Sequence, residues 1–265
     1  AMILPLIGPE RDIPAPDVGT NAEVMGWIMD TYSMFKGYAV PGVVTGKPVE
    51  MFGSLGRSAA TGRGVTITVR EILKKLGRPI EGTRVAVQGF GNVGGTAARL
   101  LHQLGLTVVA ISDVSGGMYC PTGIDVAAVS KFLSENPGKL LKDFPLPAGA
   151  SRVSNNDVIT CDTDILVPAA LENQITADNA NDIKASLVVE GANGPTSVEG
   201  DEILKKKGIL VIPDILANSG GVICSYFEWV QNIQSLMWEE KEVNRHLEEI
   251  MVRAFEEVWS ICEEK

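Results

Sequence analysis

Three glycines, spaced as Gly89-x-Gly91-x-x-Gly94, are the residues of this chain whose spacing most clearly suits chemistry. They follow a short β-branched run and lead into a helical pattern, and a second apolar run ends on Asp113, about 20 residues further on. This order of strand, glycine turn, helix, strand and acid is typical of a dinucleotide site. The first glycine permits a tight turn, the second lets backbone N–H groups approach a pyrophosphate, and the third lets the helix pack on the strand. The N-terminus of that helix adds unpaired N–H groups and the positive end of its dipole.

Asp113 also bears on which dinucleotide would bind. A carboxylate at this position accepts a hydrogen bond from the ribose 2′-OH and repels the 2′-phosphate of NADP. Neither Val114 nor Ser115 is a cation that would hold such a phosphate. We therefore expect NAD as the cofactor, with NADP as the alternative. The competing interpretation of the whole fingerprint is a glycine-rich turn that binds nothing.

Three further sites combine reactive or polar side chains with a defined local context. Asp17 follows two prolines, which suits a carboxylate held at fixed geometry for general acid–base catalysis, although a turn or cap aspartate is the alternative. Thr61 lies in the segment Arg57–Gly64, just before a predicted helix, and fits either an N-cap or a hydroxyl that faces a ligand amide. Asn218 and Ser225 are about two helical turns apart near the start of another predicted helix. One shared face would suit a small polar substrate, and Asn218 as a simple cap is the alternative.

Composition excludes several classes of partner. The 265 residues carry a formal net charge of −10, which argues against nucleic acid or an anionic membrane as a partner. No apolar run is long enough to span a membrane and no signal peptide is visible, so we expect a cytoplasmic protein. The four cysteines are scattered without a CxxC pair, which indicates free thiols and no zinc site. The only two histidines, His102 and His246, fall on predicted surface faces, so acid–base chemistry should depend on a carboxylate or a lysine.

The elements that must position these residues are short apolar runs alternating with helical patterns. Strands are predicted at Met2–Ile7, Thr83–Gln88, Thr107–Ser112, Val158–Cys161, Ile165–Val167, Leu187–Val189 and Ile209–Ile212. Helices are predicted from a capping box at Thr20 and Glu23 to Lys36 with Gly37 as C-cap, at Gly62–Leu76, Gly95–Leu104 and Ile124–Ser134, and almost throughout from Gly220. Ser115–Gly117 reads as a turn, and Asn136–Ala150 as surface. The pattern predicts an α/β fold, a Rossmann-like doubly wound sheet with a helical C-terminal segment.

At these residues the chain resembles the glutamate dehydrogenases of the amino-acid dehydrogenase superfamily. The resemblance runs in order through Gly8–Asp17, Thr45–Pro48, Gly56–Gly64, Gly89–Gly94, Pro168–Asn173, Glu190–Thr196, Asn218–Gly221 and Ser225–Gln231. It implies reversible oxidative deamination of L-glutamate to 2-oxoglutarate and ammonia, with hydride transfer to a nicotinamide. It also implies a homohexameric parent enzyme.

The resemblance assigns roles to individual residues. It implies that Asp17 handles protons at the substrate nitrogen. Arg57, Asn218 and Ser225 are implied to bind substrate, and the Ser225 hydroxyl to pair with the side-chain carboxylate, where leucine, valine and phenylalanine relatives have an apolar residue. The implied cofactor-binding residues are Thr61, Gly89, Phe90, Gly91, Asn92, Val93, Gly94, Asp113 and Asn193.

The chain departs from this family pattern in one large respect, because the glycine-rich segment with the catalytic lysine has no counterpart and the substrate domain is largely absent. We expect residues 1–48 to be a remnant of the substrate domain, 49–214 the dinucleotide-binding domain and 215–265 a helical hinge and C-terminal segment that lacks the family's last helix. The isolated chain should bind NAD(H) with little or no turnover. The alternatives are a non-catalytic NAD-binding module, a fragment whose C-terminal helices mediate oligomerisation, or a branched-chain dehydrogenase, against which Ser225 argues. The fragment itself would be monomeric or would aggregate through its opening strand.

Overall fold

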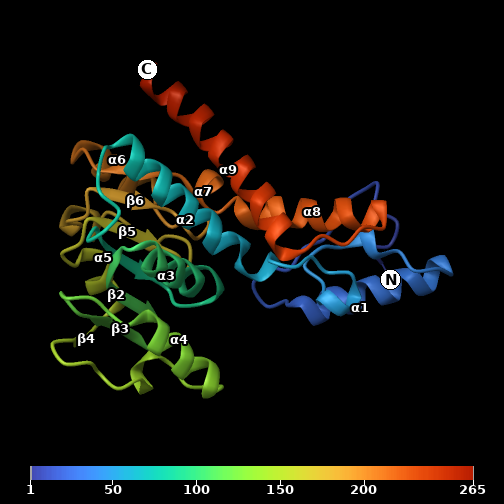
Figure 1. Cartoon of the computed structure of the whole chain (residues 1–265), viewed down its shortest axis with the longest axis horizontal. Helices are drawn as coiled ribbons and strands as arrows, with labels where there is room; N and C mark the ends of the chain where they lie inside the picture. The colour runs from blue at the N-terminus through green and yellow to red at the C-terminus, as the bar shows by residue number, and fades with distance from the viewer. Residues whose placement is uncertain (1, 265) are drawn as a thin grey trace. The chain divides into compact units, whose positions relative to one another are not determined.

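The chain folds into two compact units in a computed structural model that describes residues 2–264 (Figure 1). The first unit comprises Ala1–Ala60 and Gly221–Ile250, and the second comprises Thr61–Gly220 and Met251–Lys265. These two units differ from the three domains expected from the sequence, whose boundaries follow residues 48 and 214. The expected domain boundaries stay a prediction.

The second unit is built around a seven-stranded sheet with the order β4-β3-β2-β1-β5-β6-β7. Its strands are β1 (Arg84–Gln88), β2 (Thr107–Asp113), β3 (Gly116–Tyr119), β4 (Ser151–Val153), β5 (Ile165–Pro168), β6 (Leu187–Val189) and β7 (Leu210–Ile212). Strands β1, β2, β5, β6 and β7 run parallel, whereas β3 is antiparallel to both of its neighbours. The chain leaves β1 in one direction for β2 and returns to its other side with β5. The strand order therefore reverses at β1, which is where doubly wound sheets bind ligands.

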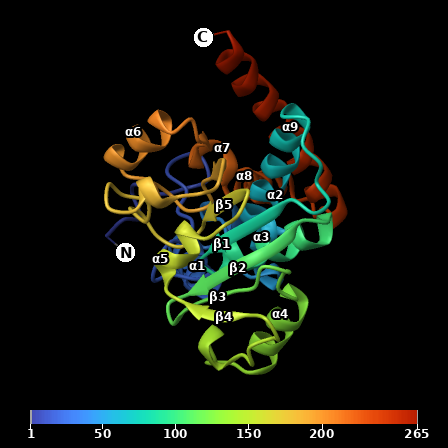
Figure 2. The ribbon, with the colours of Figure 1, turned by 90° about the vertical axis from the view of Figure 1, so that its left-hand side faces the viewer.

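Helices cover both faces of this sheet, as Figure 2 shows. They are α2 (Arg57–Lys75), α3 (Asn92–Leu104), α4 (Val126–Glu135), α5 (Asn155–Thr160), α6 (Val198–Lys206) and α7 (Asp214–Ala217). The second half of α9 (Glu240–Glu263) belongs to the same unit, and its Phe255 packs in the core. In β1, Val85 and Val87 join the core formed with α2, α3, α4 and α9, whereas Ala86 joins the core formed with α5 and α6. This alternation confirms the predicted Rossmann-like α/β fold.

Three sequence-based assignments in the second unit need correction. The run Val158–Cys161 is not a strand but mostly the end of α5, because Ser154 and Asp157 form a capping box that begins a helix. Strands β3 and β4 were not foreseen, since β3 is only four residues long and glycine-rich. Helix α2 begins at Arg57, about a turn before the predicted start at Gly62.

The first unit is mainly helical and surrounds a small core. It contains α1 (Ala22–Lys36), the 3₁₀ turns η1 (Pro41–Val43) and η2 (Val49–Met51), most of α8 (Gly220–Gln234) and the first part of α9. The core residues are Ile7, Met25, Met29, Tyr32, Val43 and Val44. The helices α8 and α9 confirm the predicted helical C-terminal segment.

Two expectations at the N-terminal side are wrong. The described part of Met2–Ile7 is a series of turns rather than a strand, and only Ile7 makes an isolated bridge, to Asp12. A strand needs a partner for its backbone groups, and this segment instead donates from Leu6 and Ile7 to its own Ile3 carbonyl. The N-cap of α1 is Asn21, whose side chain accepts the Val24 N–H, so the predicted capping box does not form; Gly37 is the C-cap, as predicted.

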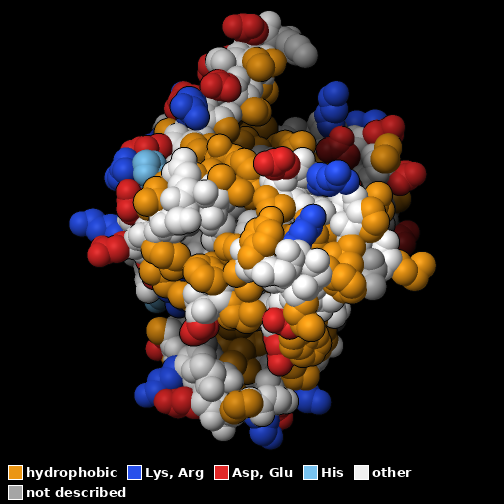
Figure 3. Space-filling model, turned by 90° about the vertical axis from the view of Figure 1, so that its right-hand side faces the viewer, with side chains coloured by type: hydrophobic (Ala, Val, Ile, Leu, Met, Phe, Trp, Pro, Cys, Tyr) orange, Lys and Arg blue, Asp and Glu red, His pale blue; other side chains and the backbone are white. Residues whose placement is uncertain are grey.

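Large hydrophobic side chains remain exposed on the first unit. Those of the N-terminal segment and α1 include Met2, Ile3, Leu6, Trp27, Met34 and Phe35. Figure 3 shows hydrophobic side chains gathered on the face that it presents. Large exposed apolar patches mark protein or membrane interaction sites, ligand-binding grooves or surfaces prone to aggregation. No helix within residues 2–264 is long and apolar enough to cross a membrane.

Candidate dinucleotide and substrate residues

The glycine turn between β1 and α3 has the geometry of a dinucleotide-binding loop. Gly89 has a φ of +92°, and a Cβ added there would lie 2.8 Å from the Ala169 carbonyl oxygen. A Cβ on Gly94 would collide with the Gly89 carbonyl oxygen. A Cβ on Gly91, in contrast, would have no neighbour within 4 Å. Packing therefore requires the first and third glycines, whereas the second keeps an open surface that a pyrophosphate can approach.

Helix α3 begins in this turn without a side-chain cap. Its N-cap is Gly91, and its first intrahelical bond runs from the Gly95 N–H to the Gly91 carbonyl. The N–H groups of Asn92, Val93 and Gly94 thus lie in the first turn, where a helix supplies no partner for them. These groups and the positive end of the dipole form a site suited to a phosphate.

The turn is tied to β2, which ends on Asp113. The Gly89 N–H donates to Ser112 Oγ at 3.3 Å. Asp113 Oδ1 accepts from Ser115 N at 2.7 Å and Ser115 Oγ at 2.5 Å, and its Oδ2 accepts from Leu141 N at 2.7 Å. The Asp113 carboxylate is half-buried and these hydrogen bonds hold it in one orientation. Strand β2 pairs with β1, which leads into the glycine turn, so the acid lies where a ribose-binding acid is expected.

Sequence reasoning missed the segment that packs against Asp113. Residues 136–150 were expected to be surface, yet Leu141 is fully buried and its carbonyl accepts from Arg152 Nη1 at 2.7 Å. The Lys142 N–H donates to Ser115 Oγ at 3.2 Å, which brings a lysine of this segment next to the end of β2. The sequence signal that could have identified this contact is the pair of adjacent leucines, Leu140 and Leu141, in a segment otherwise rich in Pro, Gly and Lys.

A second polar cluster lies where β6 and β7 end. The Asn218 Nδ2 donates to Asn193 Oδ1 at 2.7 Å, so two predicted ligand-binding residues are directly paired. Helix α8 begins at Gly220, after Asn218, and Ser225 belongs to the other unit. Asn218 is therefore the C-cap of α7, and the predicted common helical face of Asn218 and Ser225 is wrong.

Two carboxylates hold this pair in place. Asp214 Oδ2 accepts the Gly194 N–H at 2.7 Å, and the Asp214 N–H donates to Glu190 Oε2 at 3.0 Å. Burial raises the pKa of the Glu190 carboxyl above its ordinary value, against the opposing effect of the hydrogen bond from the Asp214 N–H. The sequence places both acids at the ends of predicted strands but assigns neither a role, because what they support is visible only from contacts between loops.

Thr61 lies inside α2, so its interpretation as an N-cap is wrong. The next residue, Gly62, packs so closely that an added Cβ would lie 2.8 Å from the Val93 carbonyl oxygen. A Cβ on Gly64 would lie 3.1 Å from the Ala217 carbonyl oxygen. These two glycines bring the beginning of α2 against both the α3 N-terminus and the end of α7, and they place Thr61 beside the cofactor candidates.

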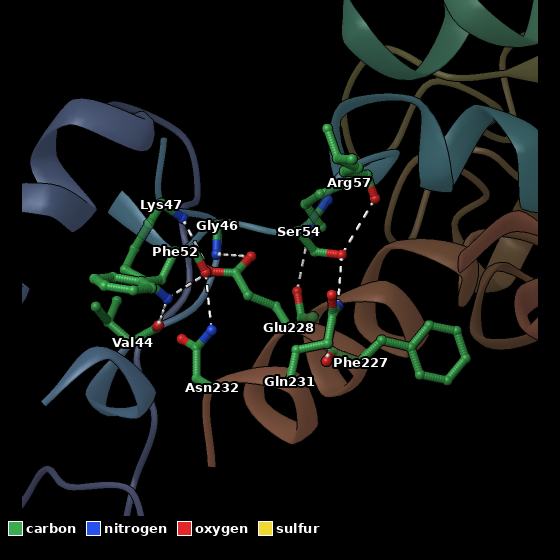
Figure 4. A network of polar contacts seen from close by, with 12 residues as sticks. Val44, Gly46, Lys47, Phe52, Ser54, Arg57, Phe227, Glu228, Gln231 and Asn232 are labelled. Atoms are coloured by element: carbon green, nitrogen blue, oxygen red, sulfur yellow. Dashed lines mark hydrogen bonds and ion pairs between the residues drawn. The ribbon is translucent and has the colours of Figure 1, made fainter. Parts of the chain in front are cut away.

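The first unit brings together Arg57 and Ser225. Arg57 Nε donates to Ser225 Oγ at 2.9 Å, although the residues are 168 positions apart in the chain. Ser225 is only 8% exposed, and Arg57 is half-buried. A guanidinium carries five N–H donors, so Arg57 retains donors for a carboxylate after holding the hydroxyl. Figure 4 shows Arg57 close to the polar groups that line this part of α8.

Asp17 lies in an exposed turn of the same unit. The Asp17 N–H donates to Thr20 Oγ1 at 2.8 Å, and Asp17 Oδ1 accepts the Val18 N–H at 2.7 Å. Thr20 thus stabilises this turn instead of beginning α1. The carboxylate is oriented and remains accessible, as an acid–base group must be.

The fold and the glycine turn define a dinucleotide-binding protein of the α/β class, and comparisons identify its family. A model of the Glutamate/Leucine/Phenylalanine/Valine dehydrogenase family matches residues 53–265, and a model of the Glu/Leu/Phe/Val dehydrogenase dimerisation domain matches residues 1–34. The chain therefore belongs to the glutamate/leucine/phenylalanine/valine dehydrogenase family, whose enzymes use a nicotinamide cofactor.

The similar proteins within this family are glutamate dehydrogenases. One from Thermotoga maritima is 54% identical over 259 residues, and glutamate dehydrogenase A2 of Halobacterium salinarum is 48% identical over 260 residues. The solved structure of the hetero-hexameric glutamate dehydrogenase from Thermus thermophilus matches 99% of this chain with a TM-score of 0.91 and 40% identity. The chain spans 61% of the length of each of these three relatives, although it is itself covered almost completely.

Proposed function

We propose that this chain is the cofactor-binding part of a glutamate dehydrogenase, which converts L-glutamate reversibly to 2-oxoglutarate and ammonia. The observation that carries this proposal is the bond between Arg57 and Ser225. It fixes a cation and a hydroxyl at one point, which suits an acidic substrate side chain and not an aliphatic one. The names of the similar proteins agree with this choice of substrate.

We further propose NAD as the cofactor. The N–H groups at the start of α3 would hold its pyrophosphate, Asp113 its adenosine ribose, and the paired Asn193 and Asn218 the region of the nicotinamide ribose and the substrate carboxylate. The open surface at Gly91 leaves room for the phosphates, so the residues present fit the group. When bound, the nicotinamide supplies the hydride acceptor.

Proton transfer is assigned to Asp17. Its carboxylate takes the proton that the substrate amino group must lose as the C–N bond gains double-bond character, and it returns a proton in the reverse direction. The bonds to Val18 and Thr20 hold the turn so that this carboxylate keeps its orientation. Within residues 2–264, no group of three or more His, Cys, Asp or Glu side chains that could hold a metal ion is found.

We also propose that the parent protein is a cytoplasmic homohexamer. The exposed apolar residues of the N-terminal segment and α1 support assembly with further protein. The residues matched by the dimerisation-domain model include this same segment.

The experiment that tests this function uses a chimera, in which the N-terminal part of the Thermotoga maritima relative that this chain does not cover is fused ahead of the chain. NADH formation is measured with glutamate and with leucine as substrate. We expect turnover of glutamate by the chimera and none by the chain alone, because the chain spans only 61% of the length of this relative. Replacement of Ser225 by Val should lower kcat/KM for glutamate by about 10–100-fold, the value of a hydrogen bond to a charged group.

Ser260 provides the matched control. It is an exposed serine of α9 whose hydroxyl donates to the Glu257 carbonyl of the same helix, so Ser260→Val should leave kcat/KM for glutamate and for leucine unchanged. A chimera that folds and binds NADH yet oxidises no amino acid would instead support a non-catalytic NAD-binding module. A preference for leucine in the unmodified chimera would indicate a branched-chain dehydrogenase.

A further inference from the structure

A fully buried ion pair between Lys47 and Glu228 lies in the first unit (Figure 4). Both side chains are 0% exposed, and Lys47 Nζ donates to Glu228 Oε1 at 2.5 Å. Lys47 Nζ also donates to the Val44 carbonyl at 2.6 Å. Glu228 accepts the Gly46 N–H at 3.0 Å and the Lys47 N–H at 3.3 Å. The carboxylate of one helix residue thus holds both the backbone and the side chain of the loop that follows η1.

Such a pair is a weak source of stability. Removing two charges from water costs several kcal/mol per ion, and replacing a buried pair by apolar residues is often neutral or stabilising. Burial lowers the pKa of the Lys47 ammonium, while Glu228 opposes that change. The pair instead fixes geometry, because its four hydrogen bonds hold the loop in a single position relative to α8.

The loop held by Glu228 packs directly on the segment that precedes Asp17. Gly46 has a φ of +78°, and a Cβ added there would lie 2.5 Å from Pro16 Cδ. The neighbouring Thr45 N–H donates to the Pro14 carbonyl at 3.0 Å. The position of Pro14 to Pro16, and hence of the next residue Asp17, is therefore set by a loop that is anchored on α8.

The same helix carries the proposed substrate hydroxyl. Ser225 precedes Glu228 by three residues, which places the two on neighbouring positions of one helical face. Trp229, adjacent to Glu228, donates its Nε1–H to the Pro9 carbonyl at 2.9 Å, at the other end of the segment that leads to Asp17. Helix α8 thus holds the Asp17 segment at both ends and holds Arg57 through Ser225.

We propose that the Lys47–Glu228 pair is a positioning unit that fixes Asp17 relative to the Arg57–Ser225 pair. The proposal rests on the catalytic and substrate-binding roles proposed above for these residues. Lys47 and Glu228 do not touch substrate; they act through Gly46 and Pro16. Catalysis depends steeply on such placement, because a displacement of about 1 Å can lower a rate by about 100-fold.

The test replaces both charges at once, as Lys47→Met with Glu228→Met, so that no unpaired buried charge remains. In the active chimera we expect kcat with glutamate to fall by about 100-fold. The melting temperature should stay within a few degrees of that of the unmodified protein, because the pair adds little stability. The NADH dissociation constant should stay within about twofold, because the proposed cofactor residues belong to the other unit. Lys47→Met with Glu228→Gln restores an acceptor for the Gly46 N–H and should recover part of kcat.

A second readout does not depend on activity. In the chain itself, hydrogen exchange at the Thr45 amide should become faster in the Met/Met variant, because its Pro14 partner is no longer held against it. Lys75→Met with Glu256→Met, which removes a more exposed ion pair, is the matched control and should change neither readout.

The outcomes separate this proposal from the proposed function. An inactive unmodified chimera would refute the proposed function. The hydrogen-exchange rate of the Thr45 amide would still show whether the Lys47–Glu228 pair holds this loop against Pro14. An active chimera whose Met/Met variant keeps its kcat, or an unchanged Thr45 exchange rate, would overturn the positioning role. Loss of folding in the Met/Met variant would also overturn it, since the pair would then be required for stability.

Discussion

At the scale of single residues, the carboxylate of Asp113 already accepts three protein hydrogen bonds and retains capacity for a fourth. Its donors are Ser115 N, Ser115 Oγ and Leu141 N. An ionised carboxylate offers about four acceptor positions. The acid is therefore oriented before a ribose arrives, and no rearrangement is needed to present the remaining acceptor site.

Glu190 shows the opposite behaviour, because burial disfavours its charge. Its pKa is raised above the ordinary value of a glutamate, so the folded protein binds this proton more tightly than the unfolded chain does. The free energy of unfolding that Glu190 contributes is therefore fully present below the unfolded pKa. It is lost as the pH rises through the raised folded pKa.

We predict that Glu190→Gln removes this loss. Glutamine is neutral at every pH and can still accept the Asp214 N–H, so the pairing at the end of β6 is retained. The free energy of unfolding of the variant minus that of the unmodified chain should increase between pH 4 and pH 7. Chemical denaturation at several pH values measures this difference. Glu172→Gln, at an exposed position, controls for the loss of one glutamate, and a difference that stays constant or decreases with pH would contradict the prediction.

The sequence was most informative where function depends on neighbours in the chain. The glycine spacing predicted the turn after β1 and the acid at the end of β2, because both lie within one strand–helix–strand unit. It could not reveal that Arg57 bonds to Ser225, 168 positions away, or that Glu190 supports Asp214. Those contacts depend on tertiary packing, and their roles in binding remain predictions.

At the scale of elements, the sequence-based assignments failed where a second local signal, or pairing with another strand, outweighed the apolar pattern. The apolar run ending at Cys161 has the composition of a buried strand, but the capping box of Ser154 and Asp157 begins a helix just before it. Strand β3 has two glycines in four residues and exists because β2 pairs with it across a tight turn. Buried strands such as β2, in contrast, were predictable because a continuous run rich in β-branched and other apolar residues is typical of a strand buried on both faces.

The glycine turn as an element yields a prediction that separates folding from binding. Gly94→Ala should lower the free energy of unfolding by about 1–3 kcal/mol, because the new methyl group collides with the Gly89 carbonyl. Gly91→Ala should cost less than about 1 kcal/mol, since its Cβ meets nothing within 4 Å and its φ of −82° suits alanine. Gly91→Ala should nevertheless weaken NADH binding at least about tenfold, because the methyl group occupies the surface reserved for the pyrophosphate.

Denaturation and NADH fluorescence, measured on both variants, decide this. If Gly91→Ala binds NADH as tightly as the unmodified chain does, the pyrophosphate does not approach this glycine, and the turn would be only a packing feature.

At the scale of the whole molecule, the two units carry different parts of the proposed chemistry. The proposed cofactor residues Thr61, Asp113 and Asn193 belong to the second unit, which has the larger sheet-based core, and so does Asn218, which is proposed to bind substrate. Asp17 and the Arg57–Ser225 pair belong to the first, whose core is small and whose surface exposes many large apolar side chains. A chain that spans 61% of its relatives should therefore retain cofactor binding more readily than turnover.

Binding of a dinucleotide by the second unit, with Asp113 selecting NAD, is the property on which the proposed function depends. It is tested most directly by a fluorescence titration of the chain with NADH and, in parallel, with NADPH. We expect a dissociation constant for NADH at least about tenfold lower than that for NADPH, a difference of about 1.4 kcal/mol, because the carboxylate would bond to a ribose hydroxyl and repel a 2′-phosphate. Asp113→Asn in the same titration should narrow this difference. Equal affinities in the unmodified chain would contradict Asp113 as the selector, and the absence of binding to either nucleotide would contradict the assignment of the glycine turn as a cofactor site.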